Sequence, residues 1–266
     1  MVPTDDVVLH HWNEAPRYGM SVAVTTRHGG VSPEPYDSLN LGLHVGDDPA
    51  NVIANRERAA HAFGVDLDTT VFAHQVHGTG CTFVDGGDRG RGARGQHDAI
   101  VGTDIMVTTS DDVTLVMLVA DCVPMVLIDP EAKVMAAAHA GWRGTADGVA
   151  ANVVAAMAQR GARPDRTVAY LGPAVSSAHY QVGADVFDGL TAAVRPSSLD
   201  PGVAKADGAA HWRVDLIAAN RQQLQLAGVP PGHLFDSGTA TSHGDYFSDR
   251  AARPCGRFAL MARLVP

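Results

Sequence analysis

Three polar residues interrupt apolar surroundings in the sequence and are of types that bind metal ions: His77 in HQVHG, Cys122 in ADCVP and His139 in AAAHAGWRG. Two imidazoles and a thiolate are suitable ligands for zinc, and three protein ligands leave the fourth tetrahedral position open for water or substrate. The residues lie 45 and 17 positions apart, which matches no general zinc motif. By themselves they leave open that Cys122 is a small buried apolar residue and His139 a core histidine.

The same residues allow two further interpretations. His74 competes with His77 as a ligand, because residues three positions apart on a strand face opposite sides and only one can point into a shared pocket. A cysteine and a histidine also suffice for acyl transfer, so Cys122 and His139 could be the nucleophile and base of a metal-free cysteine hydrolase. Metal analysis of the purified protein separates the zinc enzyme from the hydrolase.

Each of the three candidate ligands is expected at the end of a strand, where a rigid sheet can deliver side chains into one pocket. Apolar runs rich in valine and leucine predict buried strands at 113–119, 123–129 and 133–139. Turn-forming residues at 129–132 predict a hairpin between the second and third runs, and hence antiparallel pairing.

The remaining elements mix strands and helices without a regular βαβ order. Apolar spacing and capping residues predict a strand at 167–172 and helices from 149 to an end at Gly161, at 184–194 and at 215–227. The glycine- and arginine-rich segment 86–96 has no apolar anchor, which predicts a mobile surface loop, and it lacks the lysine of a P-loop. The sequence shows neither a repeat nor a clear linker, so we expect one domain over 1–266.

Composition and charge exclude several classes of protein. A formal net charge of -9 argues against a nucleic-acid partner, and no apolar stretch is long enough to predict a membrane span. The three cysteines form an odd set without paired spacing, which suits a reducing compartment. The first residues lack the positive charge and apolar core of a signal peptide, so we expect a cytoplasmic protein.

Several strings, in order along nearly the whole chain, together resemble the YfiH-type laccase-domain family. Members of this family are also called multicopper polyphenol oxidoreductases and are now regarded as purine nucleoside phosphorylases. The combination of ADC with HAGWRGT at this distance is highly specific. The strings are TTRHGGVS (25–32), PYDSLNLGLHVGDD (35–48), QVHG (75–78), ADCVPMVLIDP (120–130), HAGWRGT (139–145), GPAVSSAHYQVG (172–183) and CGRFA (255–259).

The resemblance implies a fold, a cofactor and an activity. The fold is a single-domain α+β, four-layer α/β/β/α sandwich with mixed, largely antiparallel sheets. The cofactor is a zinc ion on His77, Cys122 and His139, with copper as the alternative ion. The activity is phosphorolysis of adenosine, inosine and S-methyl-5'-thioadenosine, with adenosine deamination as a second reaction, so the partners are a purine nucleoside and inorganic phosphate.

This chemistry assigns candidate roles to further residues. Besides Cys122, Asp121 is a candidate general acid or base because it adjoins a ligand, although a regular strand would point its side chain away. Arg143, just before a predicted helix N-terminus, is the third candidate catalytic residue and a phosphate ligand. Arg27 and Arg56 are further phosphate candidates, each equally able to form a surface ion pair.

Aromatic residues could bind the base, and other functions remain open at this point. Tyr180 and Trp142 could stack on a purine, although core packing is at least as common a role for Trp142. A copper-dependent polyphenol oxidase needs several copper centres and many clustered histidines, whereas the sequence indicates ligands for one ion. A role on a peptidoglycan precursor is a third alternative. The sequence predicts neither the preferred purine nor the oligomeric state.

Overall fold

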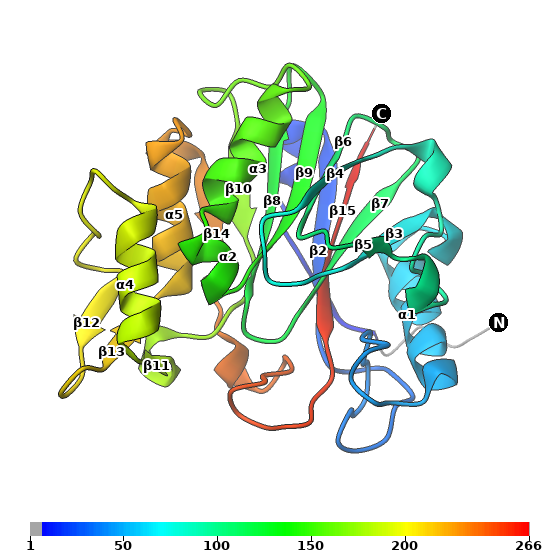
Figure 1. Cartoon of the computed structure of the whole chain (residues 1–266). Coiled ribbons are helices and arrows are strands. Elements are labelled where there is room, and N and C mark those ends of the chain that lie inside the picture. The colour runs from blue at the N-terminus through cyan, green and yellow to red at the C-terminus, as the bar shows by residue number, and fades with distance from the viewer. Residues whose placement is uncertain (1–6, 266) are drawn as a thin grey trace.

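The apolar runs at the centre of the chain form the middle of two β-sheets that pack face to face (Figure 1). This computed structural model describes residues 7–265. The first six-stranded sheet has the order β1-β2-β15-β7-β3-β5. Its strands are β1 (Leu9–His11), β2 (Met20–Thr25), β15 (Phe258–Leu264), β7 (Thr114–Val119), β3 (Thr70–His74) and β5 (Ile100–Val101).

The second six-stranded sheet has the order β14-β10-β8-β9-β6-β4 and is built around a hairpin. The hairpin strands β8 and β9 pair in antiparallel register from Val123 opposite Ala140 to Asp129 opposite Val134, as the turn residues predicted. Both sheets are mixed but largely antiparallel. The strands are β14 (Leu234–Asp236), β10 (Val168–Leu171), β8 (Val123–Asp129), β9 (Val134–Ala140), β6 (Ile105–Thr108) and β4 (Cys81–Val84).

Helices cover the outer faces of both sheets, which completes the four layers that the family resemblance implied. The helix α1 (Pro49–Phe63) packs on the first sheet through Ala59, Ala60 and Phe63. The outer face of the second sheet carries α2 (Trp142–Ala146), α3 (Val149–Ala158) and α5 (Leu216–Leu226), and α4 (Ala184–Ala193) packs against α2. No helix within residues 7–265 has the length and apolar content to cross a membrane.

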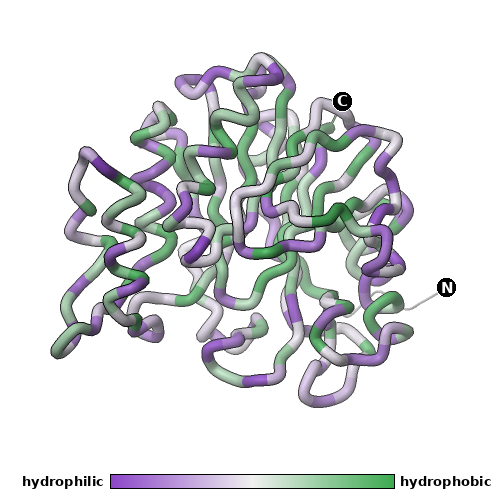
Figure 2. Tube along the Cα trace, in the orientation of Figure 1, coloured by the Kyte–Doolittle hydropathy of each residue, from purple (hydrophilic) through white to green (hydrophobic). Residues whose placement is uncertain are grey.

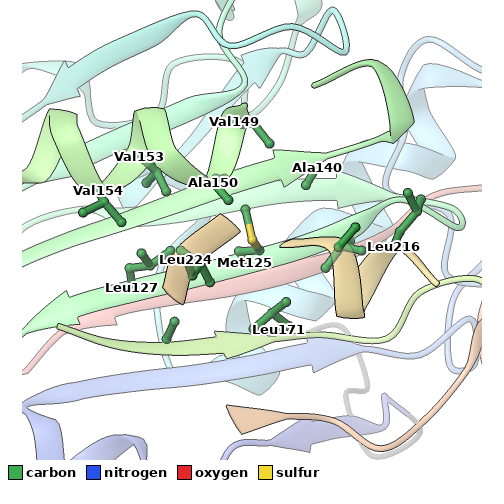
Figure 3. Close-up of a cluster of buried hydrophobic side chains, with 14 of the residues drawn as sticks. Met125, Leu127, Ala140, Val149, Ala150, Val153, Val154, Leu171, Leu216 and Leu224 are labelled. Carbon is green, nitrogen blue, oxygen red and sulfur yellow. The ribbon is translucent and has the colours of Figure 1, made fainter. Parts of the chain in front are cut away.

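The hairpin strands are apolar throughout because both of their faces are buried. Met125 and Leu127 of β8 face α3 and α5, whereas Val126 and Ile128 face the first sheet. Figure 3 shows the helix-side cluster, in which α3 and α5 meet β8 and β10. Along the chain trace in Figure 2, apolar residues concentrate in the central strands and polar residues in the outer loops.

Most predicted elements lie within a few residues of those observed. The differences are a small third sheet and the segment 86–96. A small third sheet was not predicted, because its strands are too short to show an alternating pattern; they are β11 (Gln181–Val182), β13 (Trp212–Val214) and β12 (Ala204–Ala206). Short 3-10 helices connect the longer elements: Ala15–Tyr18, Leu67–Thr69, Gly86–Asp88, Gln96–Asp98, Ser177–His179, Pro231–His233 and Thr241–His243.

The segment 86–96 is anchored, contrary to the prediction of a free surface loop. Its Ala93 is fully buried in the cluster beneath α1. Arg94 pairs with Glu57 of α1 at 2.6 Å and with Asp68 at 3.2 Å. The composition of the segment gave no sign of these contacts, because its partners lie elsewhere in the sequence.

Candidate metal centre

The structure brings His77, Cys122 and His139 together at the edge of the two sheets. One ligand atom from each residue lies within 4.8 Å of the other two. His139 is the next-to-last residue of β9, and Cys122 directly precedes β8, so the hairpin pairing of Pro124 with His139 places both at one end of the second sheet. His77 comes from the first sheet, in the turn that follows β3.

The geometry fits a single tetrahedral ion. Bond lengths of about 2.0–2.3 Å to nitrogen and sulfur place neighbouring donor atoms on the order of 3.5 Å apart around zinc. The three donors lie within 4.8 Å of one another, so they are close enough for one ion to draw them to this spacing. Within the described part of the chain, this is the one group of three or more His, Cys, Asp or Glu side chains close enough to hold a metal.

A buried carboxylate, Asp104, links two of the three candidate ligands. It accepts a hydrogen bond of 2.8 Å from Nδ1 of His139, which leaves Nε2 of that ring as the ligand atom. It also accepts hydrogen bonds from the backbone amides of Val76, His77 and Gly78 at 2.8–3.1 Å. Asp104 therefore orients one ligand through its ring and another through its backbone.

The charges of the cluster favour the thiolate form of Cys122 and the protonated form of His139, whose proton a metal ion would displace. Burial by itself raises the pKa of the Cys122 thiol, but the imidazoles of His139 and His77 outweigh burial and bring the pKa below its ordinary value. For His139, burial lowers the pKa, but the Cys122 thiolate and Asp104 outweigh it and raise the pKa. The cysteine is therefore held as the thiolate, which is the form that binds metals.

Gly141 lies next to the cluster, and its lack of a side chain leaves room for His77 and Cys122. A Cβ atom on this residue would lie 2.9 Å from Cδ2 of His77 and 3.0 Å from Sγ of Cys122. The backbone there has φ -75°, which any residue can adopt, so the requirement for glycine comes from the cluster.

We expect Gly141→Ala to weaken metal binding about tenfold, because the added methyl group displaces two ligands, and ligand placement governs affinity. Titration of the metal-free protein with zinc, followed by competition with a chelator, measures the change. Gly232→Ala is the matched control, since a Cβ there meets nothing within 4 Å. Equal affinities of the two variants would contradict this role for Gly141.

A cavity of about 500 Å³ opens over the cluster and is lined by all three candidate ligands. This volume is in the range of small-molecule sites. Tyr180 and Trp142 line the cavity, and burial raises the pKa of Tyr180 to about 12, so its hydroxyl stays protonated. The cavity combines a candidate metal centre with aromatic surface.

Arg143 lines this cavity and is exposed, as expected of a residue that binds an anion. It is the second residue of α2 rather than the residue before it. Its guanidinium lies 4.4 Å from the centroid of the Trp142 ring, which holds the side chain against the wall.

The structure contradicts the phosphate-binding prediction for Arg27. Its guanidinium is not part of the cavity wall and pairs with the carboxylate of Asp37 at 3.0 Å. The same side chain donates to the Asp37 carbonyl and stacks over Phe247. The local string could not reveal this, because an arginine in a loop shows its partner only after folding.

Arg56 is likewise a structural residue and not a phosphate clamp. Its buried guanidinium donates to the carbonyls of Leu41, Gly92 and Ala93 at 2.6–3.0 Å and stacks over Phe72. Burial lowers the pKa of Arg56 to about 9. Arg56 thus anchors the segment 86–96 to α1.

We expect Arg56→Met to destabilise the protein by about 2–4 kcal/mol, because three buried carbonyls lose their donors. Chemical denaturation measures this loss. Arg160→Met is the control, since Arg160 is exposed on the end of α3 and stacks on Phe83. A stable Arg56→Met protein would show that the carbonyls find other partners.

Asp121 is not placed to transfer protons at the metal. Its two carboxylate oxygens accept hydrogen bonds from the hydroxyls of Thr241 and Ser248 and from the amide of Arg250, at 2.6–2.7 Å. The side chain thus binds the long connection between β14 and β15, and these bonds occupy both carboxylate oxygens. The structure therefore gives Asp121 a structural role in place of the acid/base role expected from the sequence.

His74 lines the cavity but lies outside the group of candidate ligands. The strand argument does not apply to His77, because β3 ends at His74 and the following residues form a turn. His77 itself has a positive φ of 63°. Hydrogen bonds from three successive backbone amides, including that of His77, to the Asp104 carboxylate help to hold this conformation.

Sequence reasoning missed several residues at the site. Arg250, Arg253 and Arg257 line the cavity, and the density of arginines in RAARPCGR was the available signal. His44, in the string SLNLGLH, also lines it; burial, aided by Arg257, lowers its pKa to about 4, so this imidazole is neutral. Asp104 was missed because nothing in its neighbourhood distinguishes it from a surface acid.

Comparison with known proteins gives matches over nearly the whole chain. A family model described as multi-copper polyphenol oxidoreductase laccase matches residues 21–265. The chain is 40% identical over 243 residues to purine nucleoside phosphorylase YlmD of Geobacillus stearothermophilus, covering 90% of this chain and 88% of that one. It is 39% identical over 251 residues to purine nucleoside phosphorylase of Deinococcus radiodurans, covering 94% and 90%.

Solved structures share the fold. The crystal structure of YfiH from Bacillus licheniformis superposes with a TM-score of 0.91 at 35% identity, covering 96% of each chain. The structure of YlmD from Geobacillus stearothermophilus gives a TM-score of 0.90 at 37% identity, covering 93% of each chain. The similarity therefore extends over the whole four-layer arrangement.

Proposed function

Since the chain belongs to the multi-copper polyphenol oxidoreductase laccase family, we propose that it is a zinc-dependent purine nucleoside phosphorylase of the cytoplasm. Its substrates in this proposal are adenosine, inosine and S-methyl-5'-thioadenosine with inorganic phosphate, and adenosine deamination is a second activity. The observation that carries the proposal is the convergence of His77, Cys122 and His139 on one cavity that also presents arginines. Relatives named purine nucleoside phosphorylase support the substrate class.

His77, Cys122 and His139 would hold the ion, and the cavity leaves its open face accessible to a ligand. A zinc ion held in this way supplies a Lewis acid and lowers the pKa of bound water to about 7. Asp104 keeps the His139 ring in one tautomer and orientation. This chemistry would suit the proposed deamination of adenosine.

Phosphorolysis requires residues of the cavity wall that bind the phosphate and the base. The reaction breaks the bond between the purine nitrogen and C1' of the ribose, and a phosphate oxygen forms the new bond to C1'. Arginines orient the phosphate and offset its charge as it approaches. In this proposal Arg143 binds the phosphate and Tyr180 stacks on the base, which is supported by the presence of both residues in the cavity lining.

A panel of nucleosides with and without phosphate tests the function. We expect free base and ribose 1-phosphate from adenosine and inosine, and the corresponding 5-methylthioribose 1-phosphate from S-methyl-5'-thioadenosine. Chromatography of the products with zinc-loaded protein measures both reactions, since inosine from adenosine without phosphate reports deamination. A zinc-loaded protein that cleaves none of the three nucleosides would overturn the proposal.

We expect Arg143→Ala to raise KM for phosphate at least about tenfold, because one charged hydrogen-bond donor is lost from the anion site. Initial rates at varied phosphate and saturating inosine measure the effect. Arg160→Ala removes an exposed arginine outside the cavity and serves as the control. If KM for the nucleoside rises instead, Arg143 contacts the nucleoside.

One observation favours a second candidate, the metal-free cysteine hydrolase. Cys122 and His139 are hydrogen-bonded neighbours, and their pKa shifts favour a thiolate beside an imidazolium. The two proposals differ in metal content. Stoichiometric zinc in protein purified without added metal supports the phosphorylase, and metal-free active protein that is inactivated by alkylation of Cys122 supports the hydrolase.

A further inference from the structure

The cavity over the candidate metal centre is positively charged in an acidic protein. The chain carries a formal net charge of -9, yet the cavity is lined by four arginines and two aspartates. Three of these arginines come from one segment, 248–257, which we call the arginine loop. A local concentration of positive charge attracts small anions and raises their concentration at the site.

The arginines of this loop are only partly neutralised by nearby carboxylates. Arg253 and Arg257 share Asp249, at 2.5 Å and 3.6 Å. Arg250 donates to the carbonyl of Gln181 at 3.1 Å and lies 5.0 Å from the centroid of the Tyr180 ring. Neither of these two contacts gives the Arg250 side chain a carboxylate partner, so its charge is available to a ligand in the cavity.

The side chain of Asp121 holds the arginine loop next to Cys122, which directly follows Asp121 in the sequence. This carboxylate is 8% exposed and accepts three hydrogen bonds of 2.6–2.7 Å from Thr241, Ser248 and the amide of Arg250. Its backbone has φ 90°, and its carbonyl accepts from the amide of Val175 at 3.0 Å. Asp121 thus fixes the start of the loop directly beside Cys122.

From this geometry we infer that the arginine loop is the anion-binding wall of the cavity and that Asp121 is the positioning residue that holds it there. The inference deepens the proposed function, since inorganic phosphate is the anion that phosphorolysis requires. Guanidinium groups suit a multiply charged oxyanion because their donors match its oxygens. Asp121 acts through Arg250 and does not itself touch the ligand.

Two substitutions in the full-length zinc-loaded protein test this arrangement. Arg250→Gln removes the cation, and we expect it to weaken binding of inorganic phosphate at least tenfold. Asp121→Asn keeps the size of the side chain but removes its charge and one of its two acceptor oxygens, so a single oxygen remains for three donors that the carboxylate now binds. We expect a similar weakening from Asp121→Asn, with unchanged zinc content and faster amide hydrogen exchange over 241–250.

The double variant decides whether Asp121 acts through Arg250. If it does, Asp121→Asn adds little to the loss already caused by Arg250→Gln, because the two residues form one unit. Isothermal titration with phosphate measures all three variants. Asp245→Asn is the control, since Asp245 is an exposed acid of the same connection whose carboxylate faces His28.

The outcomes distinguish this inference from the proposed function. Full additivity of the two substitutions, or phosphate affinity unchanged in both, would overturn the inference. A wild-type protein that does not bind phosphate would overturn it too. If Asp121→Asn lowers kcat and removes a limb of its pH profile while phosphate affinity stays the same, Asp121 transfers protons instead. Phosphate binding without nucleoside cleavage would overturn the proposed function alone.

Discussion

Replacing Cys122 by serine is expected to release the metal and to abolish the metal-dependent reactions. The thiolate is the one charged ligand among the three, and a serine hydroxyl is a poor substitute because it stays protonated at neutral pH. Loss of a residue that only orients a ligand weakens metal binding about 10–100-fold. Loss of a ligand itself should exceed this range, and activity should fall with occupancy.

The metal content of purified Cys122→Ser, by inductively coupled plasma mass spectrometry, measures this effect. Cys81→Ser is the matched control, because Cys81 is an exposed cysteine on β4 and lies outside the cavity. Circular dichroism shows whether the variant remains folded. An inactive variant that retains stoichiometric zinc would contradict the ligand role and favour a nucleophilic one.

Replacing Asp104 by asparagine is expected to weaken zinc binding about 10–100-fold, although Asp104 is not among the candidate ligands. Its carboxylate accepts hydrogen bonds from His139 and from the amides of three successive residues around His77. The NH2 group of an asparagine is a donor and cannot accept a hydrogen bond from the N–H groups that now face the carboxylate. Either the His139 ring or the His77 turn therefore loses its acceptor. Both losses displace a ligand.

The matched control is Asp129→Asn, in the hairpin turn at the other end of β8. Asp129 is as fully buried as Asp104 and also accepts from backbone amides, those of Glu131, Ala132 and Arg163. We expect both substitutions to destabilise the protein, and only Asp104→Asn to reduce zinc affinity. The absorption spectrum of the cobalt-substituted protein would report the altered ligand geometry. Equal zinc affinity in both variants would refute a specific role for Asp104.

The number of clustered ligands tests whether this protein could be a copper-dependent polyphenol oxidase, as the family description suggests. Oxidation by several copper centres needs several groups of ligands, whereas the described residues form one such group. Copper could still occupy that group, since imidazole and thiolate ligands suit it as well. Comparing phosphorolysis by zinc-loaded and copper-loaded protein separates these cases.

The sequence by itself determined the elements whose cause is local. The hairpin of β8 and β9 follows from two apolar runs and a turn at Asp129, and α5 follows from the Asp215 cap and an apolar stripe. Two of the candidate ligands, Cys122 and His139, were predictable because they stand at the ends of these clear strands. Burial on both faces also explains why the central strands read as continuous apolar runs.

Only the tertiary structure decided which polar residues share the cavity. Arg27 and Arg250 have the same side chain, yet one pairs with Asp37 and the other lines the site. Asp104 and Asp121 accept hydrogen bonds from residues far away in the sequence, which gives each a role that no local pattern shows. The reason is physical: apolar periodicity sets which face of an element is buried, whereas the partner of a charged group depends on which distant segments the packed sheets bring within hydrogen-bonding distance.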